Sequence, residues 1–135
     1  MKTVSKLGLA FALTLILTVF ISSVGLSQEM NEKEYNKFLI KALKDENIGI
    51  RSSAAQLLGE RKVEAAIEPL KKMLKNEKHY AVRIVAAVSL YQIGNKEVLP
   101  VLKESLKKER NKTVQHVLAG IIESLEQVQY AKKQP

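Results

Sequence analysis

The nine residues IRSSAAQLL at positions 50–58 decide the fold, because they recur as VRIVAAVSL at positions 82–90, 32 residues further along the chain. A third, more divergent copy, VQHVLAGII, follows at positions 114–122 after another 32 residues. In each copy the first, fifth, sixth and ninth residues are apolar. This spacing places apolar side chains on one face of a helix. Recurrence at a fixed period predicts an architecture of stacked, similar units.

The same offset relates the segments that precede these copies. The matching positions are Ala66-Ile67 with Val98-Leu99, Leu70 with Leu102, Leu74 with Leu106 and, projected backwards, Leu70 with Phe38 and Leu74 with Ala42. Because the apolar residues follow helical spacing and the intervening turns are short and polar, we expect pairs of antiparallel helices. The expected helices span Asn31–Lys44, Ile50–Arg61, Glu64–Lys75, Tyr80–Ile93, Lys96–Lys108 and Thr113–Val128.

The motif Val-Arg-x-x-Ala-Ala-x-x-Leu, which opens the second helix of a pair, resembles a short HEAT repeat of the type found in phycobilisome-lyase-like proteins. Acidic residues in the preceding turn and prolines in the first helices, Pro69 and Pro100, fit the same pattern. The resemblance covers about residues 31–128. It implies an all-α fold, an α-α superhelix that forms a right-handed solenoid of about three HEAT-like helical hairpins. The period is shorter than the usual ~40–47 residues, but the signatures of ankyrin and tetratricopeptide repeats are absent.

In similar HEAT proteins, the turn acid and the motif arginine form a ladder between neighbouring units. The resemblance therefore implies a structural ladder made of Asp45, Arg51, Glu77 and Arg83. Gln115 occupies the arginine position of the third copy, so we expect the ladder to end at a terminal capping unit.

The N-terminus has the order of a secretory signal peptide. Lys2 and Lys6 give a basic start, residues 7–26 carry no charge, and small residues follow, with cleavage after Gly25 or Ser27. The expected organisation is a signal peptide at 1–27, a HEAT-like repeat domain at 28–129 and a polar tail at 130–135. This predicts a bacterial-type exported protein, periplasmic or secreted. An uncleaved anchor is the alternative, because the apolar run is long enough to span a bilayer.

Composition and motifs argue against catalysis. The chain has no cysteine, which excludes disulfides and thiolate metal sites. Its two histidines, His79 and His116, have no second ligand at metal-binding spacing, and no phosphate loop or Ser/His/Asp arrangement occurs. We expect no enzyme activity, metal or cofactor, and we do not transfer the chromophore-lyase activity of some similar proteins.

In HEAT-like solenoids the second helices line the concave face, where partners usually bind. At matching positions the first unit has polar Ser52, Ser53 and Gln56, whereas the second has Ile84, Val85 and Val88. An exposed apolar cluster favours binding of a protein or peptide, although deeper burial of the middle helix would also explain it. The residues predicted to form this face are Ile84, Val85, Val88, Tyr91, Gln92, His116, Val117, Ser52 and Gln56.

A row of lysines on the first helices is a second candidate surface. Lys71 and Lys75 repeat as Lys103 and Lys107. The formal net charge is +8, falling to +6 after removal of residues 1–27, which suits an anionic lipid surface or an acidic protein. Ordinary solvated charge is the alternative. Because aromatic residues are not interleaved with these lysines, we expect no nucleic acid partner.

The expected function is that of a non-catalytic, exported scaffold or adaptor that binds a protein or peptide on its concave face. The alternatives are an envelope-associated protein held to an anionic surface by the lysine row, and an accessory or maturation factor of an enzyme system. Membrane contact is expected only through an uncleaved N-terminal segment or an anionic surface. The broad apolar stripe of the last helix leaves a weak homodimer open.

Overall fold

The computed structural model describes residues 31–131, so the predicted signal peptide and the last residues of the polar tail lie outside the described range. The chain divides into two units between Tyr35 and Asn36. In the first unit, the described residues 31–35 are helical. The second unit holds everything discussed below.

This second unit is built from helical hairpins, as predicted. Each hairpin pairs a first helix with a longer second helix that follows a short turn. The elements are the helical residues 36–42, α2 (Ile48–Glu60), η1 (Glu64–Ala66), α3 (Ile67–Asn76), α4 (Tyr80–Ile93), α5 (Val98–Lys108) and α6 (Lys112–Ala131). The all-helical solenoid of HEAT-like hairpins is therefore confirmed.

Local signals explain where the helices begin and end. The Asn47 side chain accepts hydrogen bonds from the N–H groups of Gly49 and Ile50 at 2.8 and 3.4 Å, so α2 starts two residues earlier than expected. Pro69 and Pro100 occupy the third positions of α3 and α5, where a backbone N–H has no intrahelical partner. At its other end, α6 continues to Ala131, two residues beyond the predicted end of the domain.

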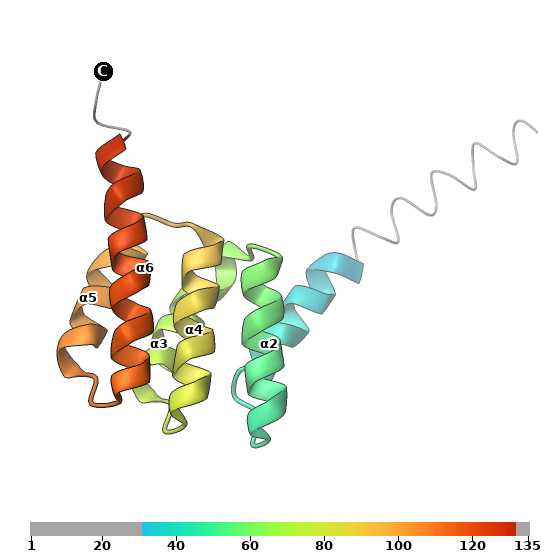
Figure 1. The fold of residues 1–135 in the computed structure, drawn as a ribbon. Helices are drawn as coiled ribbons and strands as arrows, with labels where there is room; N and C mark the ends of the chain where they lie inside the picture. The colour runs from blue at the N-terminus through green and yellow to red at the C-terminus, as the bar shows by residue number, and fades with distance from the viewer. Residues whose placement is uncertain (1–30, 132–135) are drawn as a thin grey trace, which may run out of the picture. The chain divides into compact units, whose positions relative to one another are not determined.

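The second helices lie side by side in one layer, with α4 between α2 and α6, and α3 and α5 lie behind them (Figure 1). The core fills the space between these layers. Its largest fully buried side chains include pairs related by the 32-residue offset: Leu58 and Leu90, Leu70 and Leu102, Val82 and Val114. Burying a side chain of this size contributes about 1.5–3 kcal/mol, so each repeat stabilises the stack in the same way.

The first helix breaks the 32-residue offset. Leu39 and Leu43 are 3% and 6% exposed, whereas Phe38, the expected equivalent of Leu70, is 64% exposed. Burial therefore matches Leu39 with Leu70 and Leu43 with Leu74 at an offset of 31 residues. The backward projection of Leu70 onto Phe38 and of Leu74 onto Ala42 is wrong.

A tightened helix end explains this shift of one residue. The N–H groups of Lys44 and Asp45 donate to the carbonyls three residues earlier, whereas Glu77 at the end of α3 donates to the carbonyl of Met73, four residues earlier. A 3₁₀ turn uses fewer residues than an α-helical turn, so the first helix reaches the same turn with one residue less.

None of the described helices is long and apolar enough to cross a membrane. The apolar run at 7–26 lies outside the described residues, so its role as a signal peptide or an anchor stays a prediction.

Candidate functional site

Three of the four predicted ladder residues, Arg51, Glu77 and Arg83, form ion pairs between successive hairpins. Arg51, near the start of α2, donates from Nε and Nη2 to the two carboxylate oxygens of Glu77 at 2.9 and 3.2 Å. Its third nitrogen, Nη1, donates to the backbone carbonyls of Asp45 and Glu46 at 2.8 and 2.9 Å. One guanidinium thus joins the turn of its own hairpin to the turn of the next.

The second hairpin repeats this arrangement. Arg83 donates to both carboxylate oxygens of Glu109 at 2.8 Å, and its Nη1 donates to the carbonyls of Glu77 and Lys78 at 3.0 Å. The side chains of Glu77 and Glu109 are each 9% exposed. Such bidentate, charge-assisted pairs are among the stronger hydrogen bonds in proteins because both partners are ionised and their planes match.

The two ends of the ladder differ from its middle. Asp45 contributes its backbone carbonyl, while its carboxylate accepts the N–H of Asn47 at 2.8 Å instead of contacting an arginine. At the other end, Gln115 Nε2 donates to the carbonyl of Glu109 at 2.6 Å. Glutamine keeps the contact to its own turn, but Glu109 is the last acid that an arginine reaches among the described residues.

The ladder changes the proton affinity of its carboxyl groups. Burial alone would raise the pKa of Glu77, but the hydrogen bonds from the His79 N–H and from Arg51 outweigh it and hold the pKa below its usual 4.5. The hydrogen bond from Arg83 likewise lowers the pKa of Glu109, against a smaller opposing effect of burial. Both carboxylates are therefore stabilised in their ionised form.

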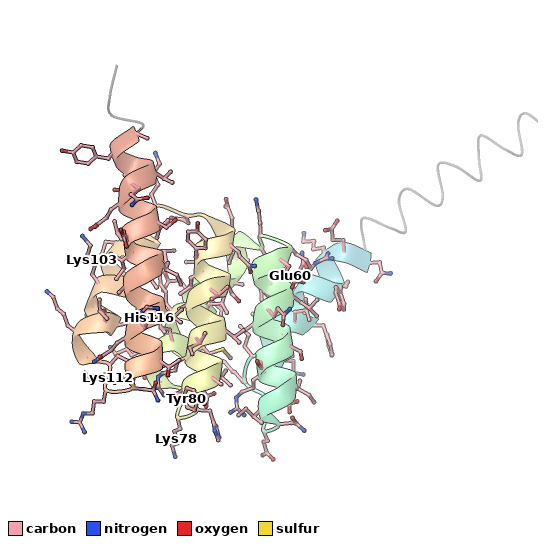
Figure 2. The ribbon with its side chains drawn as sticks, viewed as in Figure 1. Glu60, Lys78, Tyr80, Lys103, Lys112 and His116 are labelled. Atoms are coloured by element: carbon pink, nitrogen blue, oxygen red, sulfur yellow. The ribbon has the colours of Figure 1, made fainter. Side chains whose placement is uncertain are left out.

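The structure places the predicted concave-face residues at intermediate to high exposure. Six are half-buried: Ser52, Ile84, Val85, Val88, Gln92 and Val117. Three are exposed: Gln56, Tyr91 and His116. None of the nine is fully buried. Figure 2 shows His116 on α6, and Tyr80 and Lys78 at the N-terminal end of α4. We call the nine predicted concave-face residues, which do not include Tyr80 and Lys78, the second-helix face.

The apolar centre of the second-helix face is partly core and partly surface. Ile84, Val85 and Val88 pack against the buried core and retain partial exposure. Neighbouring helices flank α4 on both sides, which accounts for their burial. The Tyr91 hydroxyl lies 3.0 Å from Ser124 Oγ and links α4 to α6, so the ring of Tyr91 is held in place beside this centre while 38% exposed.

Acidic neighbours compensate part of the lysine row. Lys71 Nζ lies 2.7 Å from Glu68 Oε1, and Lys103, which projects from α5 (Figure 2), lies 2.5 Å from Glu126 of α6. Lys75 and Lys107 are exposed. The pKa of Glu104 is lowered mainly by its hydrogen bond from Lys108, and the charges of Lys75 and Lys107 contribute less. The row is thus less positive than its lysines alone suggest.

Two features bear on chemistry and association. Within residues 31–131, no three acidic or histidine side chains gather where a metal ion could be held.

The apolar stripe of α6 is mostly covered: Leu118, Ile121 and Ile122 are buried, whereas Val128 is 49% exposed. The predicted weak homodimer stays a prediction.

Sequence reasoning placed Lys72 beside the lysine row but missed that it lines a groove between the first helices with three further lysines, Lys37, Lys41 and Lys44. The signal was present, since Lys41 and Lys44 have helical i, i+3 spacing. The 32-residue offset hid it, because only the 31-residue offset aligns Lys41 and Lys44 with Lys72 and Lys75.

The hairpins, their shared core and the arginine ladder define an α-helical repeat protein. Comparison with protein families matches residues 36–127 to HEAT repeats, which is more than half of the chain. The chain therefore belongs to the HEAT repeat family. Repeats of this family typically serve as protein-interaction scaffolds and are usually non-catalytic. A comparison with curated proteins gave no match.

Proposed function

We propose that this protein is a non-catalytic scaffold or adaptor that binds a segment of another protein on its second-helix face. The observation that carries this proposal is the apolar centre of the face, Ile84, Val85 and Val88, which keeps partial exposure in the middle of the layer. The equivalent positions of α2 are the polar Ser52, Ser53 and Gln56.

The surroundings of this centre suit a protein partner. The exposed side chains of Gln56, Tyr91 and His116 can hydrogen-bond at its edge. Protein interfaces usually have an apolar centre surrounded by a polar rim. Tyrosine is enriched among the interface residues that contribute most of the binding free energy.

The ladder supports the proposal by fixing the layer before a partner arrives. Arg51 and Arg83 each tie one turn to the next, so the spacing of α2, α4 and α6 is set by bidentate pairs. A surface that needs little ordering on binding loses less conformational entropy.

The test is to compare two matched variants for capture of a protein partner. Val88→Asp places a carboxylate in the apolar centre, and Lys107→Asp makes an exposed change on the opposite layer. We expect Val88→Asp to remain folded by circular dichroism and to lose capture from the exported fraction, whereas Lys107→Asp retains it. Equal capture by both folded variants would contradict the proposal, and unfolding of Val88→Asp would assign Val88 to the core.

We also propose that the protein acts outside the cytoplasm, periplasmic or secreted. The basic, apolar and small-residue order of residues 1–27 supports this. Mass spectrometry of the protein from the exported fraction should show a chain that starts at Leu26 or Gln28. Full-length protein retained in the cytoplasm would contradict export, and full-length protein in the membrane fraction would indicate an anchor.

A second candidate function is attachment to an anionic surface through the lysine row. Lys75 and Lys107 favour it, because both are exposed and neither forms an ion pair within residues 31–131. Such attachment must weaken as salt rises, because exposed charges are screened. Binding to the second-helix face should depend less on salt, since its centre is apolar.

A further inference from the structure

Two equivalent grooves lie between successive first helices. The N-terminal groove, of about 580 Å³, lies between residues 37–44 and α3, and the C-terminal groove, of about 490 Å³, lies between α3 and α5. Their linings correspond by repeat position: Lys41 with Lys72, Lys44 with Lys75, Pro69 with Val101, and Glu77 with Glu109. The repeat thus provides two copies of one groove, whose differences can be compared directly.

The N-terminal groove carries uncompensated positive charge. Four exposed lysines line it: Lys37, Lys41, Lys44 and Lys72. The last three of these form no ion pair within the described residues 31–131. The single acid in its lining is Glu77, whose carboxylate is already bonded by Arg51 and by the His79 N–H.

The C-terminal groove carries its own acidic partners. Glu104 takes the position that Lys72 has in the N-terminal groove, and it accepts a hydrogen bond from Lys108 at 2.5 Å. Lys71, also in this lining, is paired with Glu68 at 2.7 Å. Lys72, Lys75 and Arg110 also line this groove and form no ion pair within residues 31–131, so both grooves are positively charged. The difference is that Glu104 and its partner Lys108 stand in the C-terminal groove, whereas the N-terminal groove has no such pair.

The two grooves also differ in the number of apolar residues that line their floors. In the N-terminal groove the floor is apolar and consists of Ile40, Leu43, Pro69 and Met73. Lys71 and Ser105 replace Ile40 and Met73 in the C-terminal groove. The C-terminal groove keeps only Leu74 and Val101 as apolar lining residues, so a floor of four apolar residues distinguishes the N-terminal groove.

We propose that the N-terminal groove binds an acidic segment of a partner protein. Carboxylates of the segment pair with Lys41, Lys44 and Lys72, and an apolar side chain rests on Ile40 and Met73. The volume falls within the range of sites that hold a few side chains, about 300–1,000 Å³. A groove with an apolar floor suits a peptide better than a flat lipid surface. Its lining holds no aromatic residue on which a base could stack.

This groove is distinct from the second-helix face. Its lining comes from the first helices and shares no residue with the nine of that face. The inference can therefore fail while the proposed function stands, and the reverse also holds.

The test uses a short fluorescent peptide of alternating leucine and glutamate on the full chain purified after export. A peptide of serine and glutamate and one of leucine and lysine serve as controls. We expect only the leucine–glutamate peptide to bind with a shift of the Met73 methyl resonance. In the double variant Lys41→Glu/Lys44→Glu, affinity should fall by about tenfold or more, because cations that line only the N-terminal groove turn into repelling anions.

The matched control is Lys75→Glu/Lys107→Glu, which changes the net charge equally at exposed positions outside the N-terminal groove. It should retain binding, as should Val88→Asp. Equal loss in both double variants, or equal binding of the serine peptide, would overturn the proposal in favour of diffuse attraction. The proposal would also be overturned if the leucine–glutamate peptide left the chemical shift of the Met73 methyl group unchanged in the wild-type protein. Binding to phosphatidylglycerol vesicles without binding to the peptide would overturn it in favour of a lipid surface.

Discussion

At the scale of single residues, Arg51 and Arg83 connect the hairpins. Each bonds the carbonyls of its own turn and the acid of the next turn, 26 residues away. The resemblance predicted the participants, but it could not say that Asp45 contributes a carbonyl instead of its carboxylate. The acid of each later turn is bonded by the arginine 26 residues earlier, and within residues 31–131 no arginine precedes Asp45, so its carboxylate bonds only the Asn47 N–H at 2.8 Å.

Loss of one arginine should weaken the whole domain. Arg83→Met leaves the carboxylate of Glu109 only 9% exposed and without its guanidinium. We expect the free energy of unfolding to fall by about 2 kcal/mol, below the range for fully buried pairs because Arg83 is partly exposed. Arg110→Met, an exposed arginine outside the ladder, should change it by less than about 0.5 kcal/mol. Urea unfolding of both variants checks this, and equal losses would contradict a specific role of the ladder.

The same residues predict a pH dependence. The pKa values of Glu77 and Glu109 are lowered in the folded state, so folding favours their ionised forms. Their contribution to the free energy of unfolding is present above about pH 4.5 and is lost as pH falls through the lowered pKa values. We expect acid unfolding in that window and a flatter pH dependence in Glu77→Gln. An unchanged slope in this variant, measured by urea unfolding between about pH 3 and 6, would count against the assignment.

At the scale of elements, helix types and most boundaries followed from the sequence. The expected Tyr80–Ile93 is α4 as observed, because apolar spacing and Gly94 mark its limits; Gly94 ends the helix with φ of 78°. The first helix was placed correctly but in the wrong register. A single 3₁₀ turn at Lys44 and Asp45 caused this, and a 32-residue alignment cannot detect a turn that is one residue shorter.

The close approach of α2 and α4 predicts how alanine substitutions at two helical glycines change stability. A Cβ added to Gly59 would lie 2.6 Å from Ser89 Cα, whereas one added to Gly120 of α6 would meet nothing within 4 Å. Gly59→Ala should therefore destabilise the domain by about 1–3 kcal/mol through overpacking. Gly120→Ala should stabilise it by about 0.5–1 kcal/mol, because alanine favours the helix. Thermal unfolding of the two variants should give shifts of opposite sign; shifts of the same sign would contradict the packing described here.

At the scale of the whole molecule, the repeat determines where surfaces can differ. The second-helix face was predicted from three polar-to-apolar changes, and the structure leaves those residues half-buried because α4 has a neighbour on each side. Sequence comparison cannot assign such intermediate burial, since it depends on how closely neighbouring helices pack. The N-terminal groove went unpredicted for a related reason: it forms only when two first helices stack in the observed register.

Photo-crosslinking is the most direct measurement of the central claim that the second-helix face binds a protein segment. A benzoylphenylalanine at Tyr91, beside the apolar centre, is compared with one at Lys107 on the opposite layer, in cells that export the protein. We predict a discrete crosslinked protein from position 91 that is absent from position 107 and is lost when Val88→Asp is combined with the probe. Crosslinks of equal pattern at both positions, or a product at 91 that survives Val88→Asp, would contradict the claim.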